Sequence, residues 1–166
     1  MKIIGIDPGL SGAIAVLENN KVLCIFDIPV MSEGKKNKRQ LNSALLVSLL
    51  KENILNEREE VAVVVEQVNA MPGQGVTSMF NFGQTFGAIK GICAALELPI
   101  FFVRPSKWKK HFELINSSKD SSRTKAIEMY PKLSNQLGKK KDVNKSDAIL
   151  IARFYNETRF IDENLT

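Results

Sequence analysis

The sequence predicts an α/β fold with a five-stranded mixed sheet and helices on both faces. Two observations support this prediction. Three short runs rich in Ile and Val come first and are separated only by turn residues, which is typical of an antiparallel meander; they span 2–7, 12–18 and 21–28. Two later apolar runs are continuous rather than alternating, as expected of parallel strands covered on both faces; they span 61–65 and 99–103.

Apolar residues at helical spacing fill most of the remaining chain. A polar, lysine-rich loop follows the third strand, and the first helix is expected over about 38–53. A second helix, at about 76–96, connects the two continuous strands, as parallel strands require. Three more helices are expected at 105–112, about 119–130 and about 144–157.

The composition indicates one globular domain. The chain has 166 residues, of which 44% are hydrophobic and 25% charged, as in ordinary soluble proteins. We expect a domain over 1–158 and a tail over 159–166. Cys24 and Cys93 lie in apolar stretches without metal-binding spacing, so they are expected to be core thiols in a reducing compartment. No apolar run is long enough for a signal peptide or a membrane span, so the protein is expected to be cytoplasmic.

The net charge is +5 and the isoelectric point is near 9.2. Such a charge is compatible with a polyanionic partner, although a lysine cluster can equally be a solvated loop. The basic residues gather in three clusters: Lys35, Lys36, Lys38 and Arg39; Lys107, Lys109 and Lys110; and Lys139, Lys140 and Lys141.

Three carboxylates stand where an apolar run meets a polar turn. Asp7 ends the first strand, Glu66 ends the fourth, and Asp147 lies near the start of the last helix. If the first and fourth strands are neighbours, Asp7 and Glu66 meet at one end of the sheet, where unpaired carboxylates raise one another's pKa and favour a divalent cation such as Mg²⁺ or Mn²⁺. The alternative is that all three are ordinary turn, strand-end and helix-start residues.

Three segments resemble the acidic motifs of the RuvC family of Holliday-junction resolvases, in the same order. They are Gly5-Ile-Asp7-Pro-Gly-Leu-Ser-Gly12, Val65-Glu66-Gln-Val68 and Ser146-Asp147-Ala-Ile-Leu-Ile-Ala152. The resemblance covers about 1–157. It is strongest to a branch with a Met-Pro-x-x-Gly loop, here Met71 to Gly75, and a Pro-x-x-Trp-Lys segment, here Pro105 to Lys109.

The resemblance implies a ribonuclease H-like fold and a magnesium-dependent crossover-junction endodeoxyribonuclease. Its metal ligands would be Asp7, Glu66 and Asp147, holding two Mg²⁺ ions that Mn²⁺ can replace. Two such metal ions activate a water molecule and stabilise the leaving 3′ oxygen. The family usually has a fourth ligand where this chain has Asn144. Asp142 is the alternative fourth ligand, but it could equally be the helix N-cap.

The resemblance also assigns basic and loop residues. Lys109 and Lys119 match two functional lysines, which would offset charge at the cleaved phosphate, and Lys107 competes with Lys109 for that role. Further DNA contacts are expected in the loop after Glu66, from Asn69 and from an apolar wedge formed by Met71 and Pro72. The single tryptophan, Trp108, is expected to be a packing residue.

The resemblance implies a homodimer that cuts branched DNA by paired, symmetric incision, with branch-migration proteins as further candidate partners. The helix at about 76–96 has more apolar surface than one sheet contact needs, so it is the expected dimer interface, through Phe80 and Phe86. One alternative is a catalytically weak junction-binding protein of the same fold, because Asn144 replaces a carboxylate. An actin-like phosphotransferase would need a second copy of the fold, for which 166 residues leave no room.

Overall fold

The computed structural model describes residues 1–34, 38–54, 60–69 and 73–162. Its main sheet has the strand order β3-β2-β1-β6-β7. β1 pairs antiparallel with β2 and β2 with β3, whereas β6 pairs parallel with β1 and with β7. The predicted five-stranded mixed sheet is therefore confirmed. The strands are β1 (Lys2–Ile6), β2 (Ala13–Glu18), β3 (Lys21–Asp27), β6 (Val61–Glu66) and β7 (Ile100–Val103).

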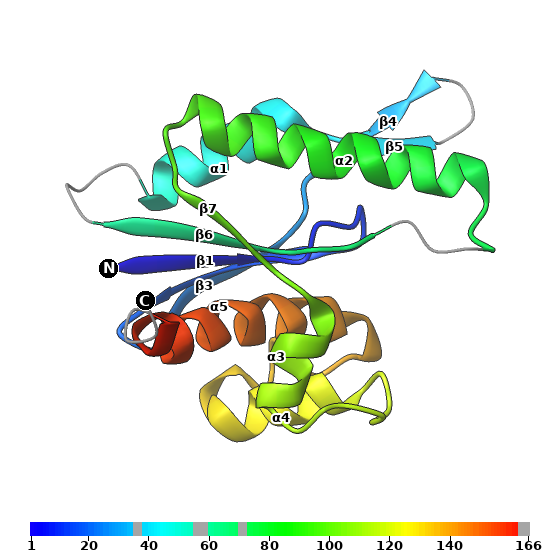
Figure 1. The fold of residues 1–166 in the computed structure, drawn as a ribbon. Helices are drawn as coiled ribbons and strands as arrows, with labels where there is room; N and C mark the ends of the chain where they lie inside the picture. The colour runs from blue at the N-terminus through cyan, green and yellow to red at the C-terminus, as the bar shows by residue number, and fades with distance from the viewer. Residues whose placement is uncertain (35–37, 55–59, 70–72, 163–166) are drawn as a thin grey trace.

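Helices cover both faces of this sheet (Figure 1). On one face lie α1 (Ser43–Ile54) and α2 (Val76–Ala95). On the other lie α3 (Pro105–His111), α4 (Ser121–Met129) and α5 (Val143–Asp162). Each face has its own apolar core, since strand side chains alternate between the two sides. Ile4, Val63 and Leu46 belong to the core under α1 and α2, and Val64, Trp108 and Ile149 to the core under α3 to α5.

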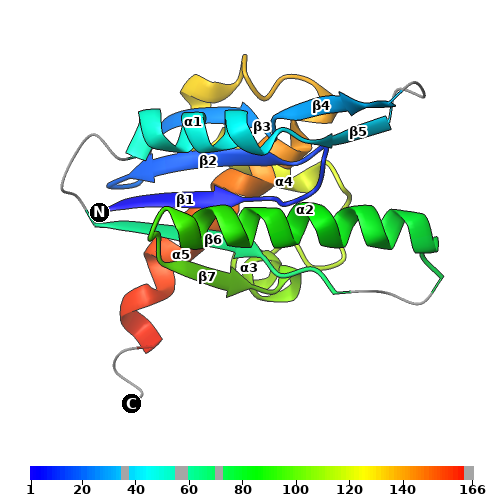
Figure 2. The same ribbon diagram turned by 90° about the horizontal axis from the view of Figure 1, so that it is seen from above.

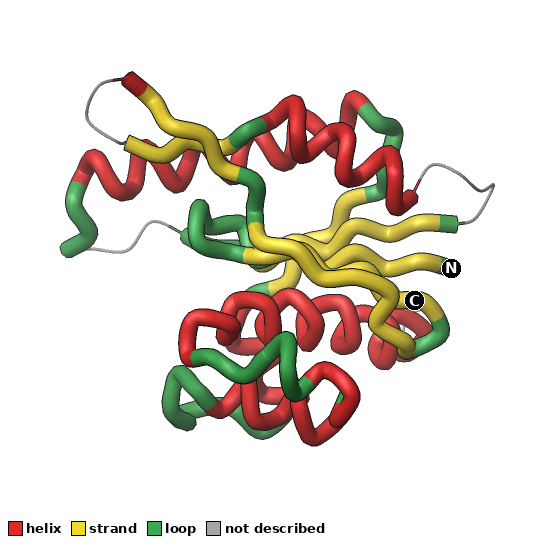
Figure 3. The backbone as a smooth tube through the Cα atoms, turned by 180° about the vertical axis from the view of Figure 1, so that it is seen from behind, coloured by secondary structure: helices red, strands yellow, loops and turns green. Residues whose placement is uncertain are grey.

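A small hairpin replaces the loop that the sequence predicted after β3. Its strands, β4 (Val30–Glu33) and β5 (Lys38–Leu41), pair antiparallel and extend beyond the ends of the main strands (Figures 2 and 3). The expected helical start at 38 is therefore wrong. α1 begins at Ser43 because the side-chain oxygen of Asn42 accepts a 3.0 Å hydrogen bond from the backbone N–H of Leu45, which caps the first turn.

The other helices agree with the prediction to within a few residues, except at the C-terminus. α5 continues to Asp162 rather than ending near 157. The helix therefore runs across the expected boundary at 158, and the division into a domain and a tail stays a prediction. Cys93 is buried and Cys24 half-buried, both as free thiols. Within the described ranges, no helix is both long and apolar enough to cross a membrane; the cytoplasmic location stays a prediction.

Gly5 allows α5 to lie directly against β1. A Cβ atom added at Gly5 would be 2.1 Å from the backbone oxygen of Ala148 and 2.9 Å from the Cβ of Ala152, distances that no side chain tolerates. Asp7 comes two residues after this contact and Asp147 one residue before it. The close approach therefore fixes how far α5 stands from the end of β1.

Candidate active site

Asp7 and Glu66 lie side by side at the end of the sheet. The parallel register pairs Ile6 with Val65, so the next residues along both strands, Asp7 and Glu66, are neighbours. A tight turn holds Asp7 in place: its backbone N–H donates to Ala13 O at 3.0 Å. A Cβ at Gly12 would lie 2.0 Å from the backbone oxygen of Asp7, so this turn needs glycine there.

Asp147 approaches the same place from the first turns of α5 and is half-buried. Its Oδ1 has no hydrogen-bond partner within the described part of the chain. An unpaired buried carboxylate oxygen is costly. The site therefore has an unused oxygen ligand for a cation.

The pKa values of all three carboxyl groups are raised. Burial raises the pKa of Asp7 to about 7, with further contributions from Glu66 and Asp147. Burial also raises the pKa of Glu66, and Asp147 adds to the effect. For Asp147, burial again raises the pKa, while Ser122, Lys109 and Lys119 act in the opposite direction. Desolvation and mutual repulsion thus disfavour the charged forms, and a divalent cation would relieve both.

The three side chains interact electrostatically but have not closed around a common point. Among the described residues, no three Asp, Glu, His or Cys side chains are arranged to hold a metal ion together. Chemically, the donor set still fits Mg²⁺ or Mn²⁺: it consists of hard carboxylate oxygens, one of them without a partner.

Trp108 is a packing residue, as expected, and it also contacts Glu66, which the sequence does not indicate. Its side chain is fully buried, and its indole Nε1 donates a 2.9 Å hydrogen bond to Oε1 of Glu66. The Nζ of Lys109 lies 5.3 Å from the centre of the same indole ring, within range of a cation–π attraction. The only hint in the sequence was the Pro-x-x-Trp-Lys segment, in which Trp108 directly precedes Lys109.

Lys109 and Lys119 both lie beside Asp147. They line one hollow of about 200 Å³ together with Asn144 and Asp147. Lys109 also lowers the pKa values of Asp7 and Glu66, so its charge reaches all three carboxylates. Lys107 lines a different hollow, with Phe101, Phe102 and Tyr155.

The two candidates for a fourth ligand have other partners. Asp142 is 4% exposed; one of its oxygens accepts from the backbone N–H of Lys139 at 2.9 Å and the other from Lys145 Nζ at 3.2 Å. These bonds close the short 3-10 helix Lys140–Asp142; within the described residues, neither oxygen of Asp142 accepts from a backbone N–H of α5, so the choice between metal ligand and N-cap of α5 stays a prediction. Asn144 Nδ2 donates to the backbone oxygen of Ser11 at 2.5 Å, which ties α5 to the turn after Asp7. Asn69 is exposed, and Met71 and Pro72 lie outside the described residues.

A five-stranded mixed sheet with carboxylates at the ends of β1 and β6 and on α5 defines the class of fold: ribonuclease H-like, as in RuvC Holliday-junction resolvases. Two solved structures from Thermus thermophilus share it. RuvC in complex with a Holliday-junction substrate has a TM-score of 0.64 and 16% identity, covering 98% of this chain and 96% of that one. A second RuvC structure has a TM-score of 0.57 and 19% identity, covering 98% and 97%.

This likeness establishes the fold. No protein-family model matches the sequence, and no curated protein is significantly similar to it.

Proposed function

We propose that this chain is a metal-dependent endodeoxyribonuclease that resolves Holliday junctions. The observation that carries the proposal is the electrostatic coupling of three partly buried carboxylates, Asp7, Glu66 and Asp147, beside a lysine whose charge reaches all of them. The structural similarity to RuvC bound to a junction supports branched DNA as the substrate.

In this proposal the three carboxylates hold two Mg²⁺ ions, or Mn²⁺ in their place. When bound, such ions supply Lewis acidity for phosphodiester hydrolysis. Lys109 and Lys119 bind the scissile phosphate and offset the charge that develops on it. Trp108 holds Glu66 in one orientation, and the burial of the carboxylates strengthens every charge interaction in the site.

DNA would reach the site across the surface at the end of the sheet. The net charge of +5 favours a polyanion. We assign strand contacts near the cut to Asn69, Met71 and Pro72, which follow Glu66 in sequence. Lys107 lies apart from the carboxylates, so we assign it to DNA outside the cleavage site.

We further propose that two copies associate through α2. Phe80 is 65% and Val76 86% exposed. Added Cβ atoms at Gly83, Gly87 and Gly91 would meet nothing within 4 Å, so another helix can approach closely. Phe86 packs against Phe82 and Phe102 of its own chain, which makes Phe80 the better probe of the interface. Paired incision of two strands related by a twofold axis needs such a dimer.

Asn144 favours a second candidate function. Its amide already donates to Ser11, and its carbonyl oxygen is a weaker cation ligand than a carboxylate. With one ligand charge fewer, the chain would bind junctions but cut them slowly.

Cleavage of an end-labelled four-way junction, with a linear duplex of the same sequence as substrate control, separates the two. We expect paired nicks at symmetric positions in Mg²⁺ and none in EDTA. Asp7→Asn, Glu66→Gln and Asp147→Asn should each bind the junction but fail to cut it. Asp142→Asn, the matched control, should cut normally and melt at a lower temperature if Asp142 is a cap. Tight binding without cleavage by the wild type would support the second candidate, and equal cutting of the duplex would contradict junction selectivity.

A further inference from the structure

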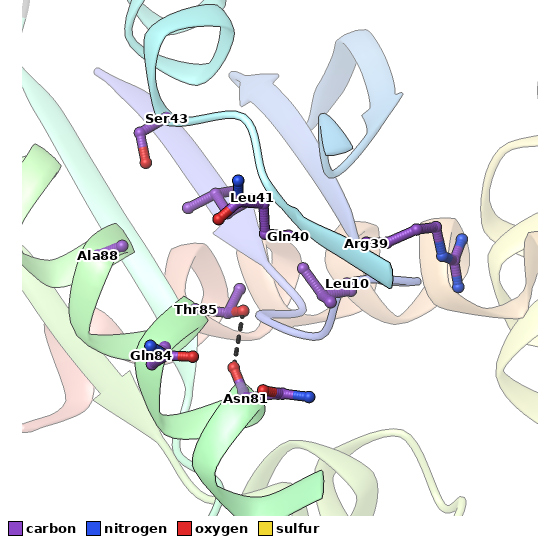
Figure 4. A pocket seen from close by; sticks show the side chains of 9 residues that line it. All are labelled: Leu10, Arg39, Gln40, Leu41, Ser43, Asn81, Gln84, Thr85 and Ala88. Atoms are coloured by element: carbon purple, nitrogen blue, oxygen red, sulfur yellow. Dashed lines mark hydrogen bonds between the residues drawn. The ribbon is translucent and has the colours of Figure 1, made fainter. Parts of the chain in front are cut away.

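A polar hollow lies between β5 and α2, next to the turn that follows Asp7. It has a volume of about 150 Å³, room for on the order of ten ordered waters. That is enough for one nucleobase but not for a duplex. Figure 4 shows the side chains of α2 on one side, those of β5 and the start of α1 on the other, and Leu10 between them.

The side chains that line the hollow are of a kind that can hydrogen-bond to a nucleobase. Three carboxamides line it, from Gln40, Asn81 and Gln84, and no carboxylate is among the described residues that line it. A carboxamide both donates and accepts hydrogen bonds, which lets Asn or Gln bind the edge of a base, adenine above all, through two bonds at once.

The carboxamides are available for this role. Within the described ranges, none of the three side chains has a hydrogen-bond partner, and Gln40, Asn81 and Gln84 are exposed in the single chain. Gln84 lies one helical turn after Phe80, at the border between the hollow and the face proposed for the dimer. Thr85 differs, because its hydroxyl donates to the backbone oxygen of Asn81 at 3.0 Å (Figure 4). Arg39 extends outward at one end of the hollow in the same view, where a guanidinium can bind the phosphate of a base held inside.

The turn over 7–12 connects this hollow to the carboxylates. Leu10 lines the hollow, Asp7 begins the turn, and Ser11 accepts the hydrogen bond from Asn144 on the opposite face of the sheet. The hollow lined by the three carboxamides, called the base hollow below, and the hollow with Lys109 and Lys119 therefore flank one turn. A DNA strand that crossed this turn with a phosphate at Asp7 would bring a neighbouring nucleotide toward the base hollow.

We propose that this hollow binds one unpaired nucleotide beside the scissile phosphate and sets the base preference of cleavage. Asn81 and Gln84 read the base edge, and Arg39 binds its phosphate. The inference rests on the proposed nuclease function for the meaning of the scissile phosphate, but the binding of the nucleotide can be tested without cleavage.

The test uses Asp7→Asn protein, which is expected to bind but not cut. It is titrated with a set of four-way junctions, each with one abasic nucleotide at a successive position around the crossover. We expect one position at which loss of the base weakens binding by on the order of 5- to 100-fold. Adding Asn81→Ala and Gln84→Ala should remove that position dependence, whereas Gln136→Ala, an exposed carboxamide outside the hollow, should leave it intact.

A parallel experiment maps cleavage on a junction pool randomised around the crossover. The wild type should show a base preference at the same position. The Asn81→Ala/Gln84→Ala variant should lose this base preference. Arg39→Ala should weaken junction binding without changing the base preference. Gln84→Glu, which keeps the size of the side chain, should also abolish the base preference. Circular dichroism checks that each variant is folded. Position-independent binding, or a preference that survives both variants, overturns the inference while leaving the nuclease proposal intact. Position-dependent binding by a wild type that cuts no junction overturns the nuclease proposal and the cleavage preference, and leaves the nucleotide site in the hollow intact.

Discussion

Trp108 and Glu66, 42 residues apart in sequence, are joined by a hydrogen bond from a fully buried indole to a carboxylate at the centre of the candidate site. Because this bond lowers the pKa of Glu66 against the effect of burial, removing it should make Glu66 harder to ionise. Trp108→Phe keeps most of the packing and loses the donor.

We expect Trp108→Phe to weaken Mn²⁺ binding several-fold, most clearly at low pH, and to raise the Mg²⁺ concentration needed for half-maximal cleavage. Calorimetric titration with Mn²⁺ measures the first effect. Phe112→Leu, a change in the same core that does not touch Glu66, is the matched control for lost packing. Equal Mn²⁺ affinities in the wild type and Trp108→Phe would show that the bond does not position Glu66.

The pKa of Asp7 gives a signed prediction for stability. Since burial and its acidic neighbours raise this pKa from 3.8 to about 7, the folded protein holds the proton more tightly than the unfolded chain does. Without divalent ions, the free energy of unfolding should therefore fall as pH rises from about 4 to 7, by a few kcal/mol at most.

Urea denaturation at several pH values, for the wild type and Asp7→Asn, isolates this contribution as a difference between the two proteins. Added Mg²⁺ at pH 8 should stabilise the wild type more than the variant, because the cation replaces the proton. A wild-type-minus-variant difference that does not change between pH 4 and 7 would contradict the raised pKa.

Lys109 and Lys107 are two residues apart but line different hollows, so they form a matched pair. Lys109→Ala should lower the cleavage rate by at least tenfold with little loss of junction affinity, and Lys107→Ala should leave the rate nearly unchanged. Single-turnover kinetics at saturating protein measure the rate apart from binding. Equal losses of rate in both variants would make Lys109 part of a general basic surface.

The proposed dimer predicts that Phe80→Asp yields folded monomers, because a charge at this exposed position would be desolvated between two copies of α2. Sedimentation at micromolar concentration, alongside circular dichroism, checks both statements. Ser48→Asp on α1, also exposed, controls for added charge. A wild type that sediments as a monomer, free and on a junction, would defeat the dimer and the paired incision that depends on it.

The contact at Gly5 predicts a large cost for one added carbon. Gly5→Ala would place Cβ 2.1 Å from a backbone oxygen of α5, so the helix must move, at a cost of roughly 3 kcal/mol or more. Gly91→Ala, in the interior of α2 with nothing within 4 Å in the single chain, should instead add about 0.5–1 kcal/mol through helix propensity when it is made in the monomeric Phe80→Asp background, where no second copy covers α2. Thermal unfolding of the two variants compares them directly.

The sequence predicted the parts of the fold that local pattern determines. Continuous apolar runs indicated parallel strands. That Asp7 and Glu66 are neighbours followed only on the condition that the first and fourth strands pair, and the family resemblance was the reason to expect them in one site. The β4–β5 hairpin could not, because its short strands are rich in charged residues and Leu41 also fits the helical spacing of α1. The N-cap at Asn42 was visible in the sequence but had been placed inside the expected helix.

Contacts between segments far apart in the chain could not be predicted from the sequence. Nothing local shows that Trp108 reaches Glu66, or that Asn144 reaches Ser11. The sequence leaves Asp142 open between metal ligand and N-cap of α5, and its bonds to Lys139 and Lys145 show a further role that no local pattern predicts: they close the turn that precedes α5. The base hollow combines residues from a turn, a hairpin and a helix, none of which forms a motif by itself.

Trp108 is the single tryptophan of the chain. It is hydrogen-bonded to Glu66 and adjacent to Lys109 in sequence. Its fluorescence therefore comes entirely from the candidate site. Protonation of Glu66, arrival of a cation or displacement of Lys109 by a phosphate would each change the emission of one known indole. The protein thus carries its own optical probe of the site, and events there can be followed in real time in unlabelled, unmodified protein.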